Sequence, residues 1–151
     1  MTAHPMPFAI PQTLAAELGQ VKAYWTGLLR GSADMPFADD LSLEAMPELA
    51  SSLALVEVFT LPERFRFAHI GVALAAAQAK ALGDKFLDEV NLNFPFEFLR
   101  AQASAAVESG APNYHEQPAN TDGSKKAYRR LVLPLWADGH TSLLLIAVSQ
   151  S

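Results

Sequence analysis

Alternating apolar and polar residues between positions 53 and 71 form the clearest pattern in the chain. Two such runs flank residues 61–63, and their period of two predicts a β-hairpin. Successive strand side chains point to opposite sides of a sheet. We therefore expect Phe65, Phe67 and His69 to share the core face of the second strand, with the two neighbouring arginines on the other face.

The last part of the chain, residues 125–151, predicts two more strands joined at 137–140, where Asp138-Gly139 is a strong hairpin signal. In the final strand both faces are apolar, so the outer face of the sheet also needs a cover. Pro134 removes a hydrogen-bond donor, and we expect a bulge at that position. A short extended segment is predicted at 113–117.

The N-terminal region predicts an arm followed by a helix. Residues 1–12 contain three prolines, which cannot continue a helix, and we expect them to form a flexible arm. Over residues 13–30 apolar side chains recur every three or four positions and form one helical stripe. Two interpretations stay open: the stripe packs on its own domain, or it is the interface with a partner or a second copy. The stripe is made of Leu14, Leu18, Val21, Trp25 and Leu28.

Three further helical segments are expected between the strands. Ser42 is placed to cap a short helix over 42–49, and the alanine-rich segment 72–83 favours a second one. A longer helix over 95–109 would have a proline in its first turn and Gly110 after its end. Together with the strands, these segments predict a single α+β domain over residues 13–151.

Aromatic residues gather beside the predicted helices and are most simply part of the core. A layer of alanine and phenylalanine over a sheet can also leave a slot for a ligand. His69 is then either a hydrogen-bonded core imidazole or a group that contacts the ligand or senses pH. The candidates for lining this slot are Phe67, His69, Phe86, Phe94, Phe98, Leu133 and Leu145.

Composition limits the classes of function. The chain has 151 residues, a net charge of -5 and no cysteine. The negative charge disfavours nonspecific binding to nucleic acid or to anionic membranes, and no apolar run is long enough to span a bilayer. The lack of cysteine and of a leader-like N-terminus favours a location in the cytoplasm. The lack of cysteine also excludes a cysteinyl adduct with flavin.

No common catalytic motif occurs in the sequence. The Gly-x-Ser-x-Gly motif of hydrolases, the phosphate-binding loop of nucleotide-binding proteins and the His-Glu-x-x-His motif of metalloproteases are all absent. His115-Glu116 and Asp138-x-His140 lack the spacing of metal ligands, and we interpret them as loop residues. The basic cluster around Tyr128, which contains Lys125, Lys126, Arg129 and Arg130, is interpreted as the solvated face of a strand. The enzymatic alternative is a small cavity enzyme in which Glu57, Asp88 or His69 acts as a buried general base.

The expected order of elements, a helix, two strands, short helices, a longer helix and three strands, is similar to that of a PAS domain, a five-stranded antiparallel sheet with helices across one face. Short fragments over residues 20–148 resemble the bacterial stand-alone PAS family more closely. These fragments are Tyr24-Trp25, Leu29-Arg30-Gly31, Met35-Pro36, Met46-Pro47, Leu55-Val56-Glu57-Val58, Pro62-x-Arg64-Phe65-Arg66-Phe67, Leu87-Asp88-Glu89, Arg130-Leu131-x-Leu133-Pro134-Leu135 and Asp138-Gly139.

This resemblance implies a sensory or signalling module rather than an enzyme. Such a module would act through protein-protein interaction, with or without a small apolar or aromatic ligand in its core. The resemblance also implies a homodimer formed through the N-terminal helix and the outer sheet face. Haem is not expected, because the axial histidines of PAS domains usually lie on a helix and no histidine falls in the predicted helices.

Overall fold

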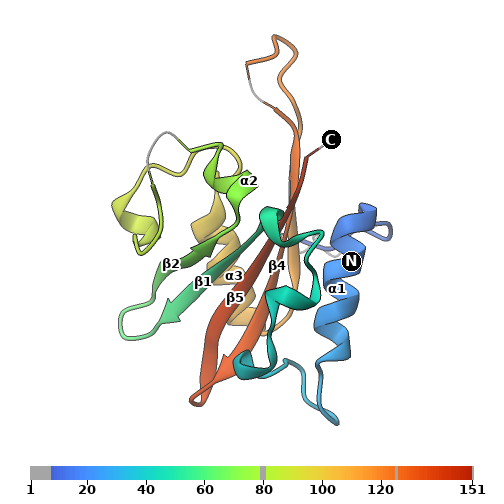
Figure 1. Cartoon of the computed structure of the whole chain (residues 1–151). Helices are drawn as coiled ribbons and strands as arrows, with labels where there is room; N and C mark the ends of the chain where they lie inside the picture. Colours follow the sequence, from blue (N-terminus) through green and yellow to red (C-terminus); the bar gives the residue numbers. More distant parts are fainter. Residues whose placement is uncertain (1–7, 79–80, 125, 151) are drawn as a thin grey trace, which may run out of the picture.

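The computed structural model describes residues 8–78, 81–124 and 126–150, which form an α+β fold with a five-stranded antiparallel sheet. The order across the sheet is β2-β1-β5-β4-β3, so β1 and β5 are neighbours near its middle (Figure 1). The α+β class and the antiparallel sheet are as predicted. The strands are β1 (Leu53–Phe59), β2 (Arg64–Ile70), β3 (Asn113–Gln117), β4 (Tyr128–Ala137) and β5 (His140–Ser149).

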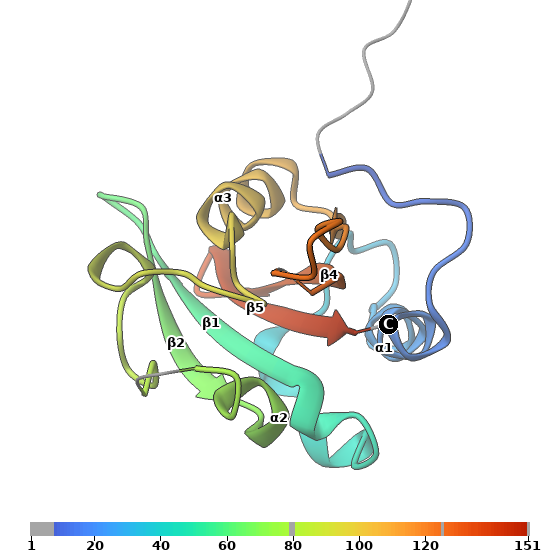
Figure 2. The ribbon, with the colours of Figure 1, turned by 90° about the horizontal axis from the view of Figure 1, so that it is seen from above.

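The two longer helices lie on opposite faces of the sheet. Figure 2 shows α3 (Leu99–Ser109) on one side and α1 (Ala16–Gly27) on the other. The short elements are α2 (Val72–Ala75) and the 3-10 turns η1 (Ala38–Asp40), η2 (Leu43–Ala45), η3 (Ala50–Ser52) and η4 (Leu87–Glu89). Within the described ranges, no helix has the length and apolar character needed to cross a membrane.

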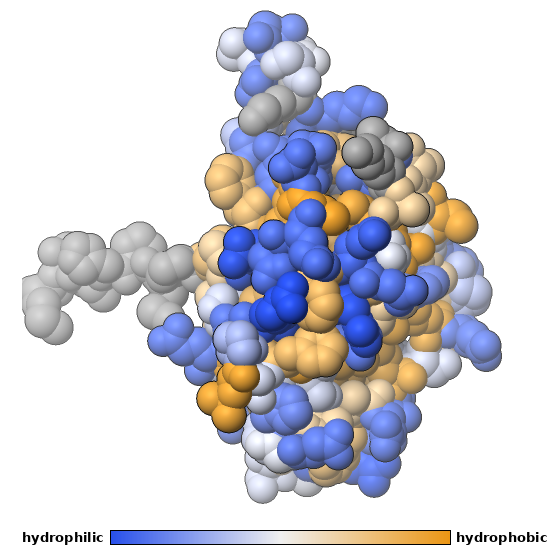
Figure 3. Space-filling view, turned by 90° about the vertical axis from the view of Figure 1, so that its left-hand side faces the viewer, coloured by the Kyte–Doolittle hydropathy of each residue, from blue (hydrophilic) through white to orange (hydrophobic). Residues whose placement is uncertain are grey.

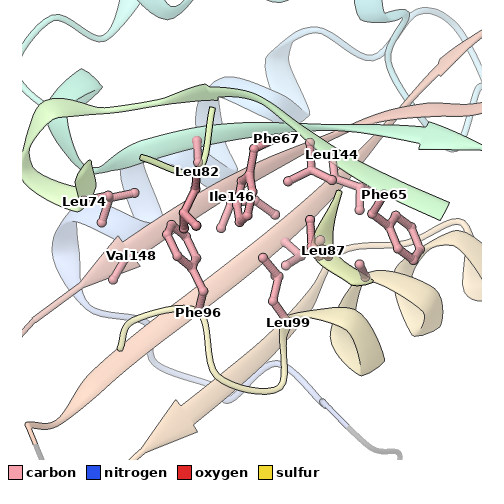
Figure 4. Close-up of a cluster of buried hydrophobic side chains, with 14 of the residues drawn as sticks. Phe65, Phe67, Leu74, Leu82, Leu87, Phe96, Leu99, Leu144, Ile146 and Val148 are labelled. Atoms are coloured by element: carbon pink, nitrogen blue, oxygen red, sulfur yellow. The ribbon is translucent and has the colours of Figure 1, made fainter. Parts of the chain in front are cut away.

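Each face of the sheet has its own apolar core. On the α3 face, Phe67, Phe96 and Leu99 pack with residues from β1, β4 and β5 (Figure 4). On the α1 face, Leu18 and Trp25 pack against the opposite side of β4 and β5. Strand β5 therefore buries side chains on both of its sides, as its unbroken apolar run predicted.

Both predicted hairpins form. Strand β1 pairs with β2, and β4 pairs with β5 across a two-residue turn between Ala137 and His140. Asp138 and Gly139 have φ angles of 55° and 83°, and positive values at both central residues are the requirement of the type I′ turn that Asp-Gly favours. The extended segment predicted at 113–117 is β3.

The helices are shorter than predicted. The first helix covers Ala16–Gly27 rather than 13–30. The alanine-rich helix, predicted over 72–83, covers only Val72–Ala75. Residues 79 and 80 of the predicted range lie outside the described residues. The long helix ends before Gly110, as predicted, but starts at Leu99 and leaves Pro95 outside. Phe98 has a φ of 63°, a left-handed conformation that cannot continue a right-handed helix, so no helix can run through it from residue 95.

Two local predictions, a helix cap at Ser42 and a bulge at Pro134, are wrong. Ser42 makes no side-chain cap, and its backbone N–H donates to the hydroxyl of Tyr24 at 2.9 Å. The residues after it form only the short turn η2. Pro134 forms no bulge: Leu135 pairs with Leu143 and Trp136 pairs with Thr141, so the extra residue of this hairpin is Ser142 in β5. Pairing with β3 ends at Val132, so Pro134 lies where β4 has become an edge strand, which tolerates proline.

A bulge in β2 moves His69 to the other face of the sheet. Val56 pairs with Phe67 and Leu55 pairs with His69, so Ala68 is an extra residue in β2. One extra residue reverses the alternation beyond it. Phe67 faces the α3 core as predicted, whereas His69 shares the face of Leu55 and is exposed. The prediction that His69 faces the core is therefore wrong.

The part of the N-terminal arm that the structure describes lies against the domain. The backbone N–H of Tyr114 in β3 donates to the carbonyl of Phe8 at 2.8 Å. Phe8 thereby occupies one hydrogen-bonding position on the outer edge of β3. Residues 1–7, which make up most of the predicted arm, lie outside the described ranges.

Candidate functional site

The outer face of the sheet, which carries α1, is covered only in part. Helix α1 and residues 35–49 pack mainly over β3, β4 and β5. Strands β1 and β2 lie to the side of α1 (Figure 1). Their outward side chains stay partly exposed, and these side chains are Glu57, Phe59, Arg64 and Arg66.

Arg64 is held by an aromatic ring and a carboxylate. Its guanidinium carbon lies 3.7 Å from the ring centroid of Phe86. Its Nε and Nη2 each donate to one carboxylate oxygen of Asp88 at 2.9 Å. A planar guanidinium that stacks on a ring and also donates two hydrogen bonds to one carboxylate has little rotational freedom left. This part of the surface is therefore fixed before any partner arrives.

Arg66 makes a second, similar arrangement beside the first. It donates to Glu57 Oε1 from Nη2 at 2.8 Å and from Nε at 3.2 Å, and its guanidinium lies 5.1 Å from the Phe59 ring. The rings of Phe59 and Phe86 are 5.5 Å apart and join the two arrangements. We refer to Glu57, Phe59, Arg64, Arg66, Phe86 and Asp88 as the arginine-aromatic surface. Figure 3, which views the side that carries β2, shows small apolar areas enclosed by hydrophilic residues.

The segment before η4 holds Phe86 in place along the free edge of β2. The N–H of Phe67 donates to the carbonyl of Lys85 at 2.9 Å, and the N–H of Asp84 donates to the carbonyl of Phe67 at 2.8 Å. The N–H of Phe86 itself donates to Glu89 Oε1 at 3.2 Å. These bonds cover the edge of β2 and fix the residue on which Arg64 stacks.

Arg64 and Asp88 of this surface stay ionised at neutral pH. The hydrogen bond from Arg64 holds the pKa of the Asp88 carboxyl below its ordinary value, and the same bond raises the pKa of Arg64. Arginine and aromatic residues are the types that dominate protein-protein hot spots, and a rim of satisfied polar groups surrounds such contacts. The arrangement is thus suited to binding another protein.

The seven residues predicted to line one pocket do not come together. Phe67 is fully buried, and its ring packs 5.1 Å from that of Phe96. Phe94 packs at the edge of the same core, 5.5 Å from the ring of Tyr128. Phe86 belongs to the arginine-aromatic surface and His69 is exposed, so neither lines a common slot with Phe67.

The other three predicted pocket residues lie elsewhere for identifiable reasons. Leu133 and Leu145 pair with each other across β4 and β5 and point to the α1 face, the opposite side of the sheet from Phe67. Phe98 is 59% exposed, because its left-handed backbone turns the side chain away before α3 begins. The prediction of one core slot lined by all seven residues is therefore wrong.

The apolar stripe of the first helix packs within its own chain. Leu18, Val21 and Trp25 are buried, and the indole N–H of Trp25 donates to the carbonyl of Pro134 at 2.8 Å. Leu14 packs against the same cluster and Leu28, the residue after α1, is half-buried. Of the two interpretations of the stripe, the structure supports packing on its own domain.

The groups named for the enzymatic alternative are not buried. Glu57 and Asp88 lie in exposed ion pairs with side chains 37% and 30% accessible, and His69 is exposed. A general base needs a pKa raised towards neutrality, whereas the pKa of Asp88 is lowered. Within the described ranges, no group of three or more histidine and carboxylate side chains could hold a metal ion.

Sequence reasoning missed the role of Arg130. It was grouped with a solvated basic cluster, yet it is fully buried and donates to three neutral oxygens. In β4 the period of two places Arg130 on the same face as Tyr128 and Val132, and that alternation was the available signal. His115, expected in a loop, lies in β3 with its ring among aromatic side chains, and His140 begins β5.

Comparison with known proteins adds no relative to these observations. No protein-family model matches the chain, and no curated protein matches it significantly in sequence.

Proposed function

We propose that this chain is a sensory or signalling module of the PAS type that acts by binding a partner protein. The order of its elements supports the proposal: a helix, two strands, short helices, a longer helix and three strands, as the resemblance implies. The five strands form an antiparallel sheet, which the resemblance also implies. Its negative charge and lack of cysteine favour a cytoplasmic protein that recognises proteins rather than nucleic acid.

The observation that carries the proposal is the arginine-aromatic surface. It lies on the half of the outer sheet face that α1 leaves open, and two arginines and two phenylalanines there are fixed by mutual contacts. Preordered aromatic and arginine side chains lose little entropy on binding. The stripe of α1 packs against its own sheet, so the proposal assigns partner binding to the arginine-aromatic surface and does not use α1.

A core ligand is not needed for this function. The space between the sheet and α3 is occupied by closely packed side chains, among them Phe67, Leu74, Phe96 and Leu99, none of which is exposed (Figure 4). We therefore base the proposal on protein recognition and place no small molecule in that core.

The proposal is tested by affinity capture from native cell extract with quantitative mass spectrometry. The variants are Arg64→Glu and Phe86→Ser. The matched controls are Arg30→Glu and Phe37→Ser, because Arg30 also pairs with an aspartate and lies 5.6 Å from a phenylalanine ring, on the part of the molecule beside β4. We expect a defined set of captured proteins to be lost with the first pair and retained with the controls. Identical capture by all four variants and the wild type would refute the proposed surface.

A further inference from the structure

A groove opens between the N-terminal arm and the end of α3. Residues 8–10 form one wall, the last turns of α3 form the second, and residues 111–113 form the floor. Its volume is about 560 Å³, within the range of sites that hold small molecules. We call it the arm groove. It lies beside β3, at the opposite edge of the sheet from β2 and the arginine-aromatic surface.

The walls of the arm groove are held by specific contacts. The carbonyl of Phe8 accepts the N–H of Tyr114, and the Phe8 ring lies 6.1 Å from that of His115. Phe8 has a φ of 62°, a conformation that costs free energy in a residue other than glycine and persists only where surrounding contacts impose it. On the floor, Asn113 is buried and exchanges hydrogen bonds with Gln102 of α3. The groove is therefore a built feature of the fold.

The lining is apolar apart from three residues, and two of these already have partners. The amide of Asn113 is bonded to Gln102, and the hydroxyl of Ser109 is bonded to backbone groups of Ala106 and Ala111. The third is Glu108, whose exposed side chain forms no ion pair within the described part of the chain. An anionic group beside an apolar surface selects ligands that carry a cation next to an apolar body.

We infer that the arm groove binds small molecules that combine a compact apolar body with a cationic amine. The apolar body lies against Ile10 and Ala105, and the ammonium group pairs with the Glu108 carboxylate. The net charge of -5 adds a general attraction for cations. This site is separate from the arginine-aromatic surface. Its test does not depend on whether that surface binds a partner protein.

Three probes that share a phenylethyl group test the inference on the full chain by protein-observed NMR. They are 2-phenylethylamine, 2-phenylethanol and 3-phenylpropionate, which differ mainly in the charge at the end of the chain. The amine should bind with a Kd of about 1 to 10 mM, the range expected for a fragment of this size. The alcohol should bind about two- to fivefold more weakly, as expected for the loss of one exposed ion pair, and the carboxylate weakest of all. Shifted amides should cluster at residues 105–113.

Two variants locate the site and the charge preference. Glu108→Gln should bind amine and alcohol equally, while Glu44→Gln, an exposed glutamate on η2, should keep the wild-type preference. Ala105→Phe should fill the groove and abolish binding of all three probes, with thermal unfolding confirming that the domain is folded. Equal binding of the three probes by the wild type, shifts outside the groove, or no binding of the amine at a concentration of about 10 mM would overturn the inference.

Discussion

Arg130 ties α3 to the segment that precedes it. Its Nε donates to Gln102 Oε1 at 2.7 Å, and its two terminal nitrogens donate to the carbonyls of Pro95 and Glu97, each at 2.8 Å. Burial lowers the pKa of Arg130 to about 10, so the side chain remains protonated at neutral pH. The three bonds compensate for removing the charge from water, and each depends on the fork shape of the guanidinium.

Arg130→Lys should therefore destabilise the fold although it preserves the charge. A lysine ammonium cannot reach all three acceptors, and each buried acceptor left unpaired costs about 1 to 3 kcal/mol. We expect a loss of roughly 2 to 4 kcal/mol in the free energy of unfolding, measured in urea. Arg129→Lys is the control, because Arg129 is partly exposed and approaches Glu116 at 3.6 Å, and it should change stability by less than about 0.5 kcal/mol. Equal effects of the two variants would contradict this role.

His115 is a second residue whose environment is unusual. Its ring lies 5.8 Å from the rings of both Phe98 and Tyr128, and its Nε2 is buried without a hydrogen-bond partner among the described residues. Burial, and secondly the positive charge of Arg130, lower the pKa of His115. The unfolded chain therefore takes up a proton at a higher pH than the folded chain does.

This difference predicts the direction of a pH dependence. Unfolding binds a proton when the pH is below the ordinary histidine pKa of about 6.5 and above the folded value, so stability should fall as the pH falls through that window. The urea midpoint should drop more in the wild type than in His115→Phe between about pH 7.5 and about pH 5.5. A His69→Gln control, at an exposed histidine, should keep the wild-type dependence. An unchanged slope in His115→Phe would contradict the assignment.

At the scale of elements, α1 is an integral part of the fold. Trp25 is 5% exposed, and its indole N–H bonds the carbonyl of Pro134. Trp25→Ala should lower the free energy of unfolding by about 3 to 5 kcal/mol, the usual cost of removing a large aromatic side chain from a core. Gln20→Ala, on the exposed side of the same helix, should stay within about 0.5 kcal/mol of the wild type. If both variants unfolded like the wild type, α1 would not be packed as described.

Elements with strong local signals were predictable, and those decided by distant contacts were not. The turn at Asp138-Gly139 follows from local conformational preference alone. The bulge at Ala68 has no comparable signal, and it reversed the expected orientation of His69. Helix α3 was predicted to start too early because the left-handed conformation of Phe98 is imposed by the tertiary fold.

The candidate site was predictable only in part, for the same reason. Alternation placed Arg64 and Arg66 on the outer face of β2, where the structure has them. The partners of Arg64, Phe86 and Asp88, come from a segment more than twenty residues later, and pairing over that distance leaves no local pattern. The sequence therefore indicated which face is polar, but it did not indicate that the face is an ordered cluster of rings and ion pairs.

At the scale of the whole molecule, the fold leaves one ordered part of the outer sheet face open. Helix α1 covers the side over β3, β4 and β5, α3 covers the opposite face, and the arginine-aromatic surface over β1 and β2 remains accessible. This division assigns stability to the covered faces and recognition to the open one. Each arginine of this surface is paired with a carboxylate of the same chain. Replacing one arginine by an acidic residue breaks that pair and reverses the local charge, so it should disrupt a protein contact at this surface.

Site-specific photo-crosslinking in the native cell tests this claim most directly. A photoreactive phenylalanine analogue is placed at Phe59, in the arginine-aromatic surface, or at Phe37, an exposed aromatic residue outside it. We predict a discrete crosslinked protein from position 59 that is lost when Arg64→Glu is added, and none from position 37. Absence of an adduct at position 59, or an adduct there that survives Arg64→Glu, would contradict the proposed recognition surface.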